Sequence, residues 1–571
     1  MSSFDPGAAR AFSQQQQRTE IRFIAPPPTE LDLLDEWLGG PMGIDAGVLR
    51  QADAAAWPAP WLWRTLLLSL EIMQGSRLPA LELPRIVSLT AVSEAEGKWH
   101  AAVLMPFVEY VPRAVGEIVV SGSMRLCHWA RSRPVDDASI AQFFEGLEKP
   151  ILSRIKRMVP GGKSTVPVLR AAHAIGIPFT HLGSGIYQLG WGSSACRVDR
   201  STTGADSAMG ARLAQNKVDT ARLLKTGGLP APMHFIVKDA EEALAAARKL
   251  GWPVVVKPGD RDRGEGVTVD VADDEALVSA VERANDGSTR NLVIVEQQVP
   301  GVCHRLFMLR GQLLYAVKRL PMSVQGDGEA SVEQLIHHAV QADRRQPPWR
   351  RSGIQPMDPP ALAAMAAAGF SPSSVPAQGQ RVPLRRIEST ADGGVDEDVS
   401  AIVHPDNLEI ARRASALFDL EVAGIDIICE DISAAWHASR AIINEVNFAP
   451  LLGGGDISRS NLGRYLEELL PDQGRIPVEL FVGDEAALQS ARRRCAELAA
   501  AGRRCWITSA TQTIDASGRE WKMPLDRTRS RVAALLLDRE VDAVMAVMSE
   551  DEFRRSGPPL PGLEPSTAIE G

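Results

Sequence analysis

The amino-acid sequence predicts a mixed α/β (α+β) fold divided into several domains. Helix-type and strand-type segments alternate through most of the chain, a pattern that is typical of α/β units. At 571 residues the chain is too long for a single hydrophobic core, so we expect about three to four domains. Its 45% hydrophobic and 23% charged residues are those of an ordinary globular protein.

Charge, cysteine spacing and apolar runs exclude several classes of protein. The net charge of −9, from 62 basic and 71 acidic residues, gives no bulk basicity for binding nucleic acid. The six cysteines have neither paired nor metal-type spacing, which indicates reduced thiols. The N-terminus has no apolar signal core, and Arg64 and Glu71 interrupt the longest apolar stretch, which is too short to span a bilayer. We therefore expect a cytoplasmic protein with no membrane and no nucleic-acid partner.

The first 163 residues carry no recognisable chemistry. Residues 1–20 are polar and glutamine-rich, and we expect them to be disordered. Residues 21–163 mix helical and strand patterns and form an expected N-terminal domain. Trp57, Trp61 and Trp63 could form a ligand platform, but packing under a proline-rich turn is the favoured interpretation.

The next stretch alternates helices and strands and leads to a lysine followed by glycines. Residues 165–183 predict an amphipathic helix and a short strand, and residues 217–250 predict a helix, a strand and a helix. A further strand ends at Lys257, before a loop that contains Gly259, Gly264 and Gly266. Glycines let backbone N–H groups close on a phosphate, and a lysine at a strand end supplies positive charge. Taken alone, this pattern favours an ordinary hairpin turn.

Basic residues follow on predicted strands and loops. Arg305, Lys318 and Arg319 alternate with apolar residues in two strand-like runs. Residues 322–380 are rich in Pro, Gly and Ala and predict helices with a large loop, in which a basic run at 344–351 is expected to be solvated. A Ser/Thr/Gly loop suited to binding an anion comes directly after this stretch.

The chemistry of the chain is concentrated in residues 422–450. Two short β-branched runs flank a polar loop, which predicts two strands joined by a long hairpin connection. If the strands end near Cys429 and restart near Ile442, Asp426 lies across the ladder from Glu445, and Asn447 points to the same face. Three oxygen donors on one patch suit Mg²⁺, which completes its shell with water and nucleotide phosphates. Residue types alone favour the alternative of a polar sheet face in water.

The ordered set of these motifs resembles the ATP-grasp superfamily of carboxylate–amine ligases, and within it the cyanophycin synthetase family. The resemblance runs from Thr165 to Pro450 through VVVKPGDRDRGEGVTV, VIVEQQVPG, RLFMLRGQLLYAVKR, VHPDNLEIA, VAGIDIICEDIS and INEVNFAP. It implies an ATP-grasp fold over residues 164–475. For the patch in residues 422–450, it favours a metal–nucleotide site over a polar sheet face in water.

The resemblance also implies individual roles. The two lysines would contact the α- and β-phosphates of ATP beneath a lid at residues 260–266, and the strand at 296–299 would hold adenine. The implied cofactor-binding residues are Lys217, Lys257, Asp260, Gly264, Gly266, Glu296, Gln297, Gln298, Val299 and Cys303. The implied ligands of two Mg²⁺ ions are Asp426, Glu445 and Asn447. The implied catalytic residues, which would steady the substrate carboxylate and its acyl phosphate, are Arg305, Arg319 and Arg385.

The sequence departs from the family pattern in the cofactor and substrate sites. Cys303 stands where the family usually has an acidic ribose ligand. The substrate loop, Ser-Thr-Gly-Gly in the family, is interrupted here by two extra residues. The implied substrate residues are Ser389, Thr390, Gly393 and Gly394.

The C-terminal part departs further from the family. Residues 476–557 resemble a Mur-ligase-like domain but lack the lysine and threonines of its phosphate-binding loop. Val547 stands where a carboxylate is expected. We therefore expect a degenerate domain that has lost its ATP site and serves packing or oligomer contacts, followed by a flexible tail at 558–571.

The expected function is that of an ATP-dependent ligase. It would join an amino-acid or peptide carboxylate to an amine through an acyl phosphate, releasing ADP and phosphate. The expected partners are small-molecule substrates and further copies of the chain in a dimer or tetramer. The alternative is a non-catalytic, nucleotide-binding regulatory or scaffold subunit of a longer synthetase. Cys303 and the decayed C-terminal domain motivate this alternative, whereas the retained metal triad favours the enzyme.

Overall fold

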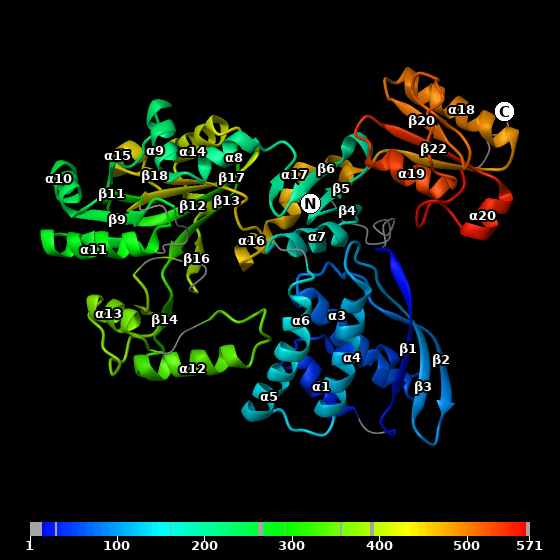
Figure 1. Ribbon diagram of the computed structural model, residues 1–571, viewed down its shortest axis with the longest axis horizontal. Helices are drawn as coiled ribbons and strands as arrows, with labels where there is room; N and C mark the ends of the chain where they lie inside the picture. The colour runs from blue at the N-terminus through cyan, green and yellow to red at the C-terminus, as the bar shows by residue number, and fades with distance from the viewer. Residues whose placement is uncertain are drawn as a thin grey trace.

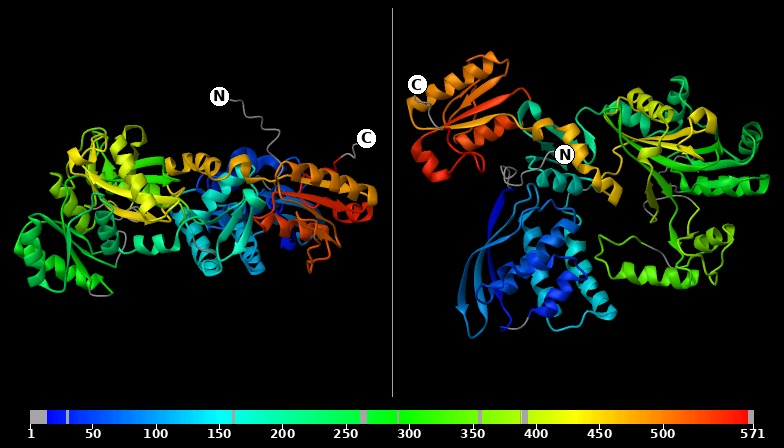
Figure 2. Two further views of the ribbon diagram at one scale, coloured as in Figure 1. Left: turned by 90° about the horizontal axis from the view of Figure 1, so that it is seen from above. Right: turned by 180° about the vertical axis from the view of Figure 1, so that it is seen from behind.

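The structure is a computed structural model with mixed helices and sheets, as the sequence predicts. It describes residues 14–28, 31–159, 162–260, 266–289, 292–353, 357–386, 388 and 393–566. Figure 1 shows two neighbouring sheets at one end of the molecule, a C-terminal unit at the other, and the N-terminal unit beside the middle. The views of Figure 2 keep the same order, so the C-terminal unit lies far from the two neighbouring sheets.

The N-terminal unit is an antiparallel sheet of order β1-β3-β2 packed on helices. Its main elements are β1 (Gln16–Ile24), α1 (Asp32–Gly39), α2 (Ala46–Leu49), α3 (Ala59–Gly75), β2 (Arg85–Ser93), β3 (Lys98–Pro106), α4 (Arg113–Ala130), α5 (Asp137–Leu147) and α6 (Ser153–Ile155). Trp61 is fully buried and Trp63 is 7% exposed, and the partly buried Trp57 packs against the same core, which confirms the packing interpretation of the tryptophan cluster.

The expectation of disorder over residues 1–20 is wrong for residues 16–20. These residues belong to β1 and pair with β3, with Gln16 opposite Pro106. The Gln14 side chain donates to the carbonyl oxygen of Pro79 at 2.6 Å and accepts from the backbone N–H of Leu81 at 2.8 Å. The glutamines therefore satisfy buried polar groups of the domain, which their composition does not reveal. Residues 1–13 lie outside the described residues.

A small sheet of order β4-β5-β6-β7 connects the three larger parts of the molecule. It is preceded by α7 (Thr165–Ala174), and the four strands are β4 (Phe179–Gly183), β5 (Ile186–Leu189), β6 (Cys196–Asp199) and β7 (Thr202–Thr203). The predicted helix and strand at 165–183 are thus confirmed. Helix α17 (Leu462–Leu469) packs against α7, and both helices share a hydrophobic core with side chains of the largest sheet, such as Phe307 and Tyr315.

The first of the two neighbouring sheets is antiparallel, has the order β10-β9-β11-β8 and is covered by α10 and α11. Its elements follow α8 (Ala208–Ala214) and α9 (Lys217–Thr226). They are β8 (His234–Val237), α10 (Ala240–Leu250), β9 (Val254–Pro258), β10 (Thr268–Val271), α11 (Asp274–Gly287) and β11 (Val293–Gln297). Alanine and valine side chains form its core, which explains why strict helix and strand periodicities were legible in the sequence here.

The second sheet is the largest, antiparallel, with the order β16-β13-β12-β17-β18. Its elements are β12 (Val302–Leu309), β13 (Gln312–Leu320), β16 (Val395–Asp398), α14 (Pro405–Leu417), β17 (Val422–Cys429), α15 (Trp436–Ser439), β18 (Ile442–Phe448) and, after the sheet, α16 (Asp456–Ser460). One face packs on α14 through alternate residues such as Ile425 and Ile427. The residues between them, Asp426 among them, therefore point to the opposite face.

An insertion at residues 321–386 leaves this sheet between β13 and β16 (Figure 1). It contains β14 (Ser323–Gln325), α12 (Val332–Arg344), α13 (Pro359–Ala367) and β15 (Arg381–Pro383) around a small core of its own. The basic run at 344–351 is exposed at Arg344, Arg345 and Arg350, as we expected, but Arg345, Arg350 and Arg351 each also form an ion pair with the N-terminal unit. The sequence could not reveal these partners because they lie more than 200 residues away.

The C-terminal unit has three parallel strands, β19-β22-β20, with β21 antiparallel at one edge. Its elements are β19 (Val478–Val482), α18 (Glu485–Ala500), β20 (Cys505–Thr508), β21 (Thr513–Ile514), α19 (Thr528–Leu537), β22 (Ala543–Met548) and α20 (Glu550–Ser556). The expectation of a flexible tail is wrong for residues 558–566. Leu560 and Leu563 pack on the core of this unit, and the backbone N–H of Ser566 donates to the carbonyl oxygen of Leu480 at 2.7 Å.

In the described part of the chain, every helix is too short or too polar to cross a lipid bilayer.

Candidate functional site

The β17–β18 hairpin brings the three predicted oxygen donors onto one patch. The strands end at Cys429 and restart at Ile442, and Asp426 pairs with Glu445 across the ladder, as predicted. Asn447 lies two residues farther along β18 and opposite Gly424. A bulge between Asp426 and Ile427 leaves the three side chains on the face that α14 does not cover.

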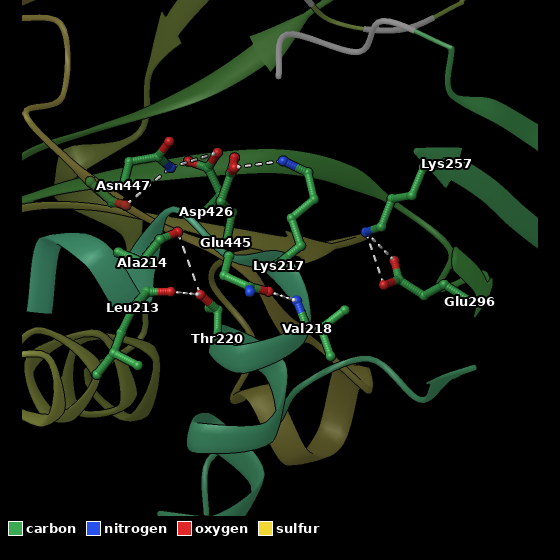
Figure 3. Close-up of polar contacts among 12 residues, drawn as sticks. Leu213, Ala214, Lys217, Val218, Thr220, Lys257, Glu296, Asp426, Glu445 and Asn447 are labelled. Carbon is green, nitrogen blue, oxygen red and sulfur yellow. Dashed lines mark hydrogen bonds and ion pairs between the residues drawn. The ribbon is translucent and has the colours of Figure 1, made fainter. Parts of the chain in front are cut away.

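Two cations reach into this patch. Arg305 of β12 donates to both carboxylate oxygens of Asp426, at 2.7 and 2.6 Å. Lys217, the first residue of α9, lies 3.4 Å from Glu445 through Nζ (Figure 3). The amide nitrogen of Asn447 donates to the Gly424 carbonyl and to Asp426 at 3.3 Å, so its amide oxygen is the atom left to face a ligand.

Arg319 of β13 extends the cationic side of the patch. Its guanidinium lies 4.0 Å from Asp426, which is only 3% exposed. Burial opposes the charge of Arg305, but the charge and hydrogen bonds of Asp426 outweigh burial and raise the pKa of this guanidinium above its ordinary value. Arg305 is therefore a permanent cation beside the reacting face, and Arg305 and Arg319 lie together as a pair of candidate anion ligands.

Lys257 and Glu296, to which the resemblance gives separate roles, form one ion pair. Lys257 lies on β9 and Glu296 on the neighbouring β11, and Lys257 Nζ lies 2.9 Å from the Glu296 carboxylate (Figure 3). The two residues are 8% and 6% exposed. A buried lysine needs a counter-charge, and Glu296 supplies it.

The predicted lid is fixed at its first residue. Asp260 accepts from Ser288 Oγ at 2.8 Å and from the backbone N–H and Oγ1 of Thr289 at 2.9 and 2.6 Å. The Thr289 hydroxyl is the main reason that the pKa of Asp260 falls to about 2. Gly266, at the other end of the lid, has φ +70°, a conformation that glycine adopts freely. Gly264 lies outside the described residues.

The residues predicted to hold adenine and ribose are engaged in part with the sheet itself. The backbone N–H of Gln297 donates to the Met233 carbonyl at 2.9 Å, and the Gln298 side chain bonds Asp270 of β10. Gln297 is exposed, whereas Val299 is half-buried. Cys303 is 4% exposed, and burial raises the pKa of its thiol well above the ordinary value.

Arg385, the third predicted catalytic arginine, has an acidic partner of its own. It binds both carboxylate oxygens of Asp358 in the insertion, at 3.0 and 2.9 Å. Asp358 also caps α13 by accepting from the N–H of Ala361. Of the predicted substrate loop, Gly393 has φ +77° and lies beside Met322, and Gly394 is half-buried. Ser389 and Thr390 lie outside the described residues.

Two acidic residues near the arginines were missed by the sequence reading. Asp396 of β16 pairs with Arg319 across the ladder, and Glu388 lies close enough to Cys303 to share a hydrogen bond. Burial is the main cause that raises the pKa of each carboxyl above its ordinary value. The signal available in the sequence was the alternation of Asp396 and Asp398 in a short run, which we had assigned to a loop.

The donor set of the patch fits Mg²⁺. Its ligands would be two carboxylates and one amide oxygen, the hard donors that this ion prefers. Within the described residues there is no group of three or more His, Cys, Asp and Glu side chains that could hold a metal by themselves. Two carboxylates with an amide match a Mg²⁺ site that takes its remaining ligands from phosphates and water.

A cleft lies in the C-terminal unit at the strand ends. Parallel α/β sheets commonly bind ligands at this end of their strands. The cleft has a volume of about 370 Å³ at the carboxyl ends of β19, β20 and β22, and Val547 lines it. Its charged lining residues are Asp484, Glu485 and Glu552, without lysine or arginine. An acidic cleft repels phosphate, in agreement with the expected loss of a second ATP site.

Comparisons with known proteins agree with this geometry. Residues 216–305 match the family model described as carbamoyl-phosphate synthase L chain, ATP binding domain. The chain is 28% identical over 403 residues to cyanophycin synthetase of Trichormus variabilis, which covers 67% of this chain and 43% of that protein. It is also 28% identical over 260 residues to a glutathione biosynthesis bifunctional protein of Mannheimia succiniciproducens, covering 44% of this chain and 34% of that protein. The chain thus matches less than half the length of these relatives.

Solved structures of similar proteins include a bifunctional glutathione synthetase from Pasteurella multocida. Its TM-score is 0.42 at 20% identity, covering 63% of this chain and 58% of that one. A D-alanine–D-alanine ligase from Bacillus anthracis has a TM-score of 0.29 at 14% identity, covering 47% and 70%. By sequence, the chain is thus similar to the cyanophycin synthetases over about two thirds of its length, and residues 216–305 match an ATP-binding domain.

Proposed function

We propose that the chain is an ADP-forming carboxylate–amine ligase that joins an amino-acid or peptide carboxylate to an amine. The observation that carries the proposal is the patch on β17 and β18. There Asp426, Glu445 and Asn447 share one face, with Lys217 and Arg305 bonded to its carboxylates. Alternating hard oxygen donors and cations match a metal–triphosphate complex better than a solvated sheet face, which has no reason to bury Asp426.

In this proposal Asp426, Glu445 and Asn447 would hold two Mg²⁺ ions, which would neutralise the charge that develops on the β- and γ-phosphate oxygens. Lys217 and Lys257 contact the phosphates, and the backbone of residues 260–266 covers them. Lys257 is held at its place on β9 by the ion pair with Glu296.

The remaining residues act on the acid and the amine. The substrate carboxylate attacks the γ-phosphorus of ATP. The bond between the γ-phosphorus and the β–γ bridging oxygen breaks, and ADP leaves. The amine then attacks the carbonyl carbon of the acyl phosphate, the C–O bond to phosphate breaks, and an amide, phosphate and a proton are released. Arg305, Arg319 and Arg385 stabilise the negative oxygens of both steps, since guanidinium groups bind such oxygens through paired N–H donors. Gly393 and Gly394 border the place where the substrate binds.

A single ATP site supports a single type of amide bond. The C-terminal cleft offers acidic side chains where a second phosphate site would need a lysine. We infer that this unit packs against the rest of the chain or against another copy, and that the protein works as a cytoplasmic homo-oligomer. These two inferences rest on the sequence expectations alone.

The decisive experiment measures ADP release from ATP and Mg²⁺ with pooled carboxylates and amines. We expect release only when both kinds of substrate are present, together with a product whose mass equals the two substrates minus water. Mass spectrometry of that product identifies the acid and the amine. ATP binding without turnover, and activity that arises only after a second protein is added, would instead establish a regulatory or scaffold subunit.

A further inference from the structure

The segment that follows α12 joins the insertion to the N-terminal unit through a tryptophan. Trp349 packs against the hydrophobic core of the N-terminal unit, although it belongs to the insertion. Its indole ring lies directly over Gly75, the last residue of α3, where an added Cβ would overlap three atoms of the ring. A residue without a side chain is therefore required at position 75 for this contact to form.

Three arginines surround Trp349 and reach three different helical segments of the N-terminal unit. Arg345 lies 2.6 Å from Asp137, Arg350 lies 2.8 Å from Glu71, and Arg351 lies 2.9 Å from Glu148. The Arg351 guanidinium also stacks 5.2 Å from the centre of the buried Phe144 ring. We name Arg345, Trp349, Arg350 and Arg351 the clasp.

The other end of the insertion reaches the candidate active site. Asp358 binds Arg385 through two hydrogen bonds, and Arg381 forms an ion pair of 2.9 Å with Glu397 of β16. Glu397 follows Asp396 along β16, and Asp396 pairs with Arg319. The insertion thus binds Arg385 through Asp358 and contacts the strand that carries Asp396, and the clasp fixes the insertion to the N-terminal unit. Figure 2 shows the insertion lying between the largest sheet and the N-terminal unit.

We propose that the N-terminal unit, through the clasp, positions the part of the active site that binds the substrate carboxylate. With the clasp docked on α3 and α5, the insertion and Asp358 hold Arg385 where it can meet the substrate carboxylate. Trp349 is the main positioning residue. Each exposed ion pair contributes little to the free energy of docking and weakens with salt, whereas a packed indole contributes more and is insensitive to salt. The inference rests on the proposed function and adds to it a role for a domain without catalytic residues of its own.

The test uses two alanine substitutions of the same type in the same domain. Gly75→Ala adds a methyl group that expels Trp349, while by helix propensity alone it favours α3. Gly116→Ala in α4 is the matched control, since an added Cβ there meets no atom within 4 Å. Trp349→Ala opens the same contact from the insertion side, which keeps the test valid if Gly75→Ala fails to fold.

Two measurements separate docking from catalysis. Trypsin cleavage after Arg345, Arg350 and Arg351 reports docking, because a released segment fits a protease more readily. The kinetic readout is kcat/KM for the acid substrate together with the Kd for ATP. For Gly75→Ala and for Trp349→Ala we expect faster cleavage and a fall of kcat/KM by about tenfold or more. The Kd for ATP should stay within about twofold, because the clasp lies away from Lys217 and Lys257.

Each outcome is decisive. The Gly75→Ala, Trp349→Ala double variant should be no worse than the poorer single variant, because both changes remove one contact. Additive losses would overturn the assignment of that contact. Faster cleavage with unchanged kcat/KM would overturn the positioning role, and unchanged cleavage would overturn the clasp itself. A wild-type protein that never releases ADP would refute the proposed function, whereas the cleavage rates would still decide whether the clasp exists.

Discussion

Replacing Lys217 by methionine should change the affinities for Mg²⁺ and for ATP in opposite directions. In the described patch Lys217, Arg305 and Arg319 lie against the carboxylates of Asp426 and Glu445. These cations oppose binding of a bare cation at the two carboxylates and attract a triphosphate. Mg²⁺ alone should therefore bind weakly, and Mg²⁺ with ATP much more tightly.

The size of the effect follows from the Lys217–Glu445 contact. The two groups are 3.4 Å apart, with side chains 20% and 30% exposed. Unit charges about 4 Å apart near a protein surface interact by about 4 kcal/mol, and solvent exposure of both groups reduces the net contribution to about 1 kcal/mol. Loss of this competition should strengthen the binding of Mg²⁺ alone by about fivefold. Loss of a phosphate contact should weaken ATP binding by about tenfold or more.

Isothermal titration calorimetry with Mg²⁺ alone, and with ATP in its absence, measures both affinities. Lys225→Met, at an exposed lysine in the last turn of the same helix, is the matched control and should change neither. If Lys217→Met leaves the Mg²⁺ affinity unchanged or lowers it, Glu445 is not a metal ligand and the charge argument fails.

Three further predictions concern the same site. Asp426→Asn should lower kcat in the ADP assay by about 100- to 1000-fold, because one charged ligand of the metal is lost. The control is Glu430→Gln, at an exposed carboxylate just past the end of the same strand, which should keep the wild-type rate. Glu296→Gln leaves Lys257 buried without its counter-charge and should lower the free energy of unfolding by about 3 kcal/mol in urea titrations; an unchanged midpoint would contradict the buried pair. The Asp260 contacts stabilise the folded state fully above the unfolded pKa near 3.8, and this contribution is lost as the pH falls through about 2; a carboxyl ¹³C titration with its midpoint near 4 would contradict the hydrogen bonds.

Much of the local structure around the patch was legible in the sequence. The ends of β17 and β18 followed from two β-branched runs around a polar loop, and a strand period of two then fixed Asp426 opposite Glu445. The helix α10 followed from its apolar spacing. In each case the information lies within about 30 residues of chain, so short-range rules suffice.

The sequence by itself therefore determined which residues could hold a metal and on which face of a hairpin they lie, because period and turn position are local properties. Only the tertiary structure decided their partners. Arg305 meets Asp426 across 121 residues, and Lys257 takes Glu296 as its counter-ion from a neighbouring strand. Likewise, the exposed basic run at 344–351 contacts the N-terminal unit because acidic side chains and Gly75, which has no side chain, lie opposite it there. Such pairings depend on how sheets and domains come together in space, and no periodicity within a segment encodes them.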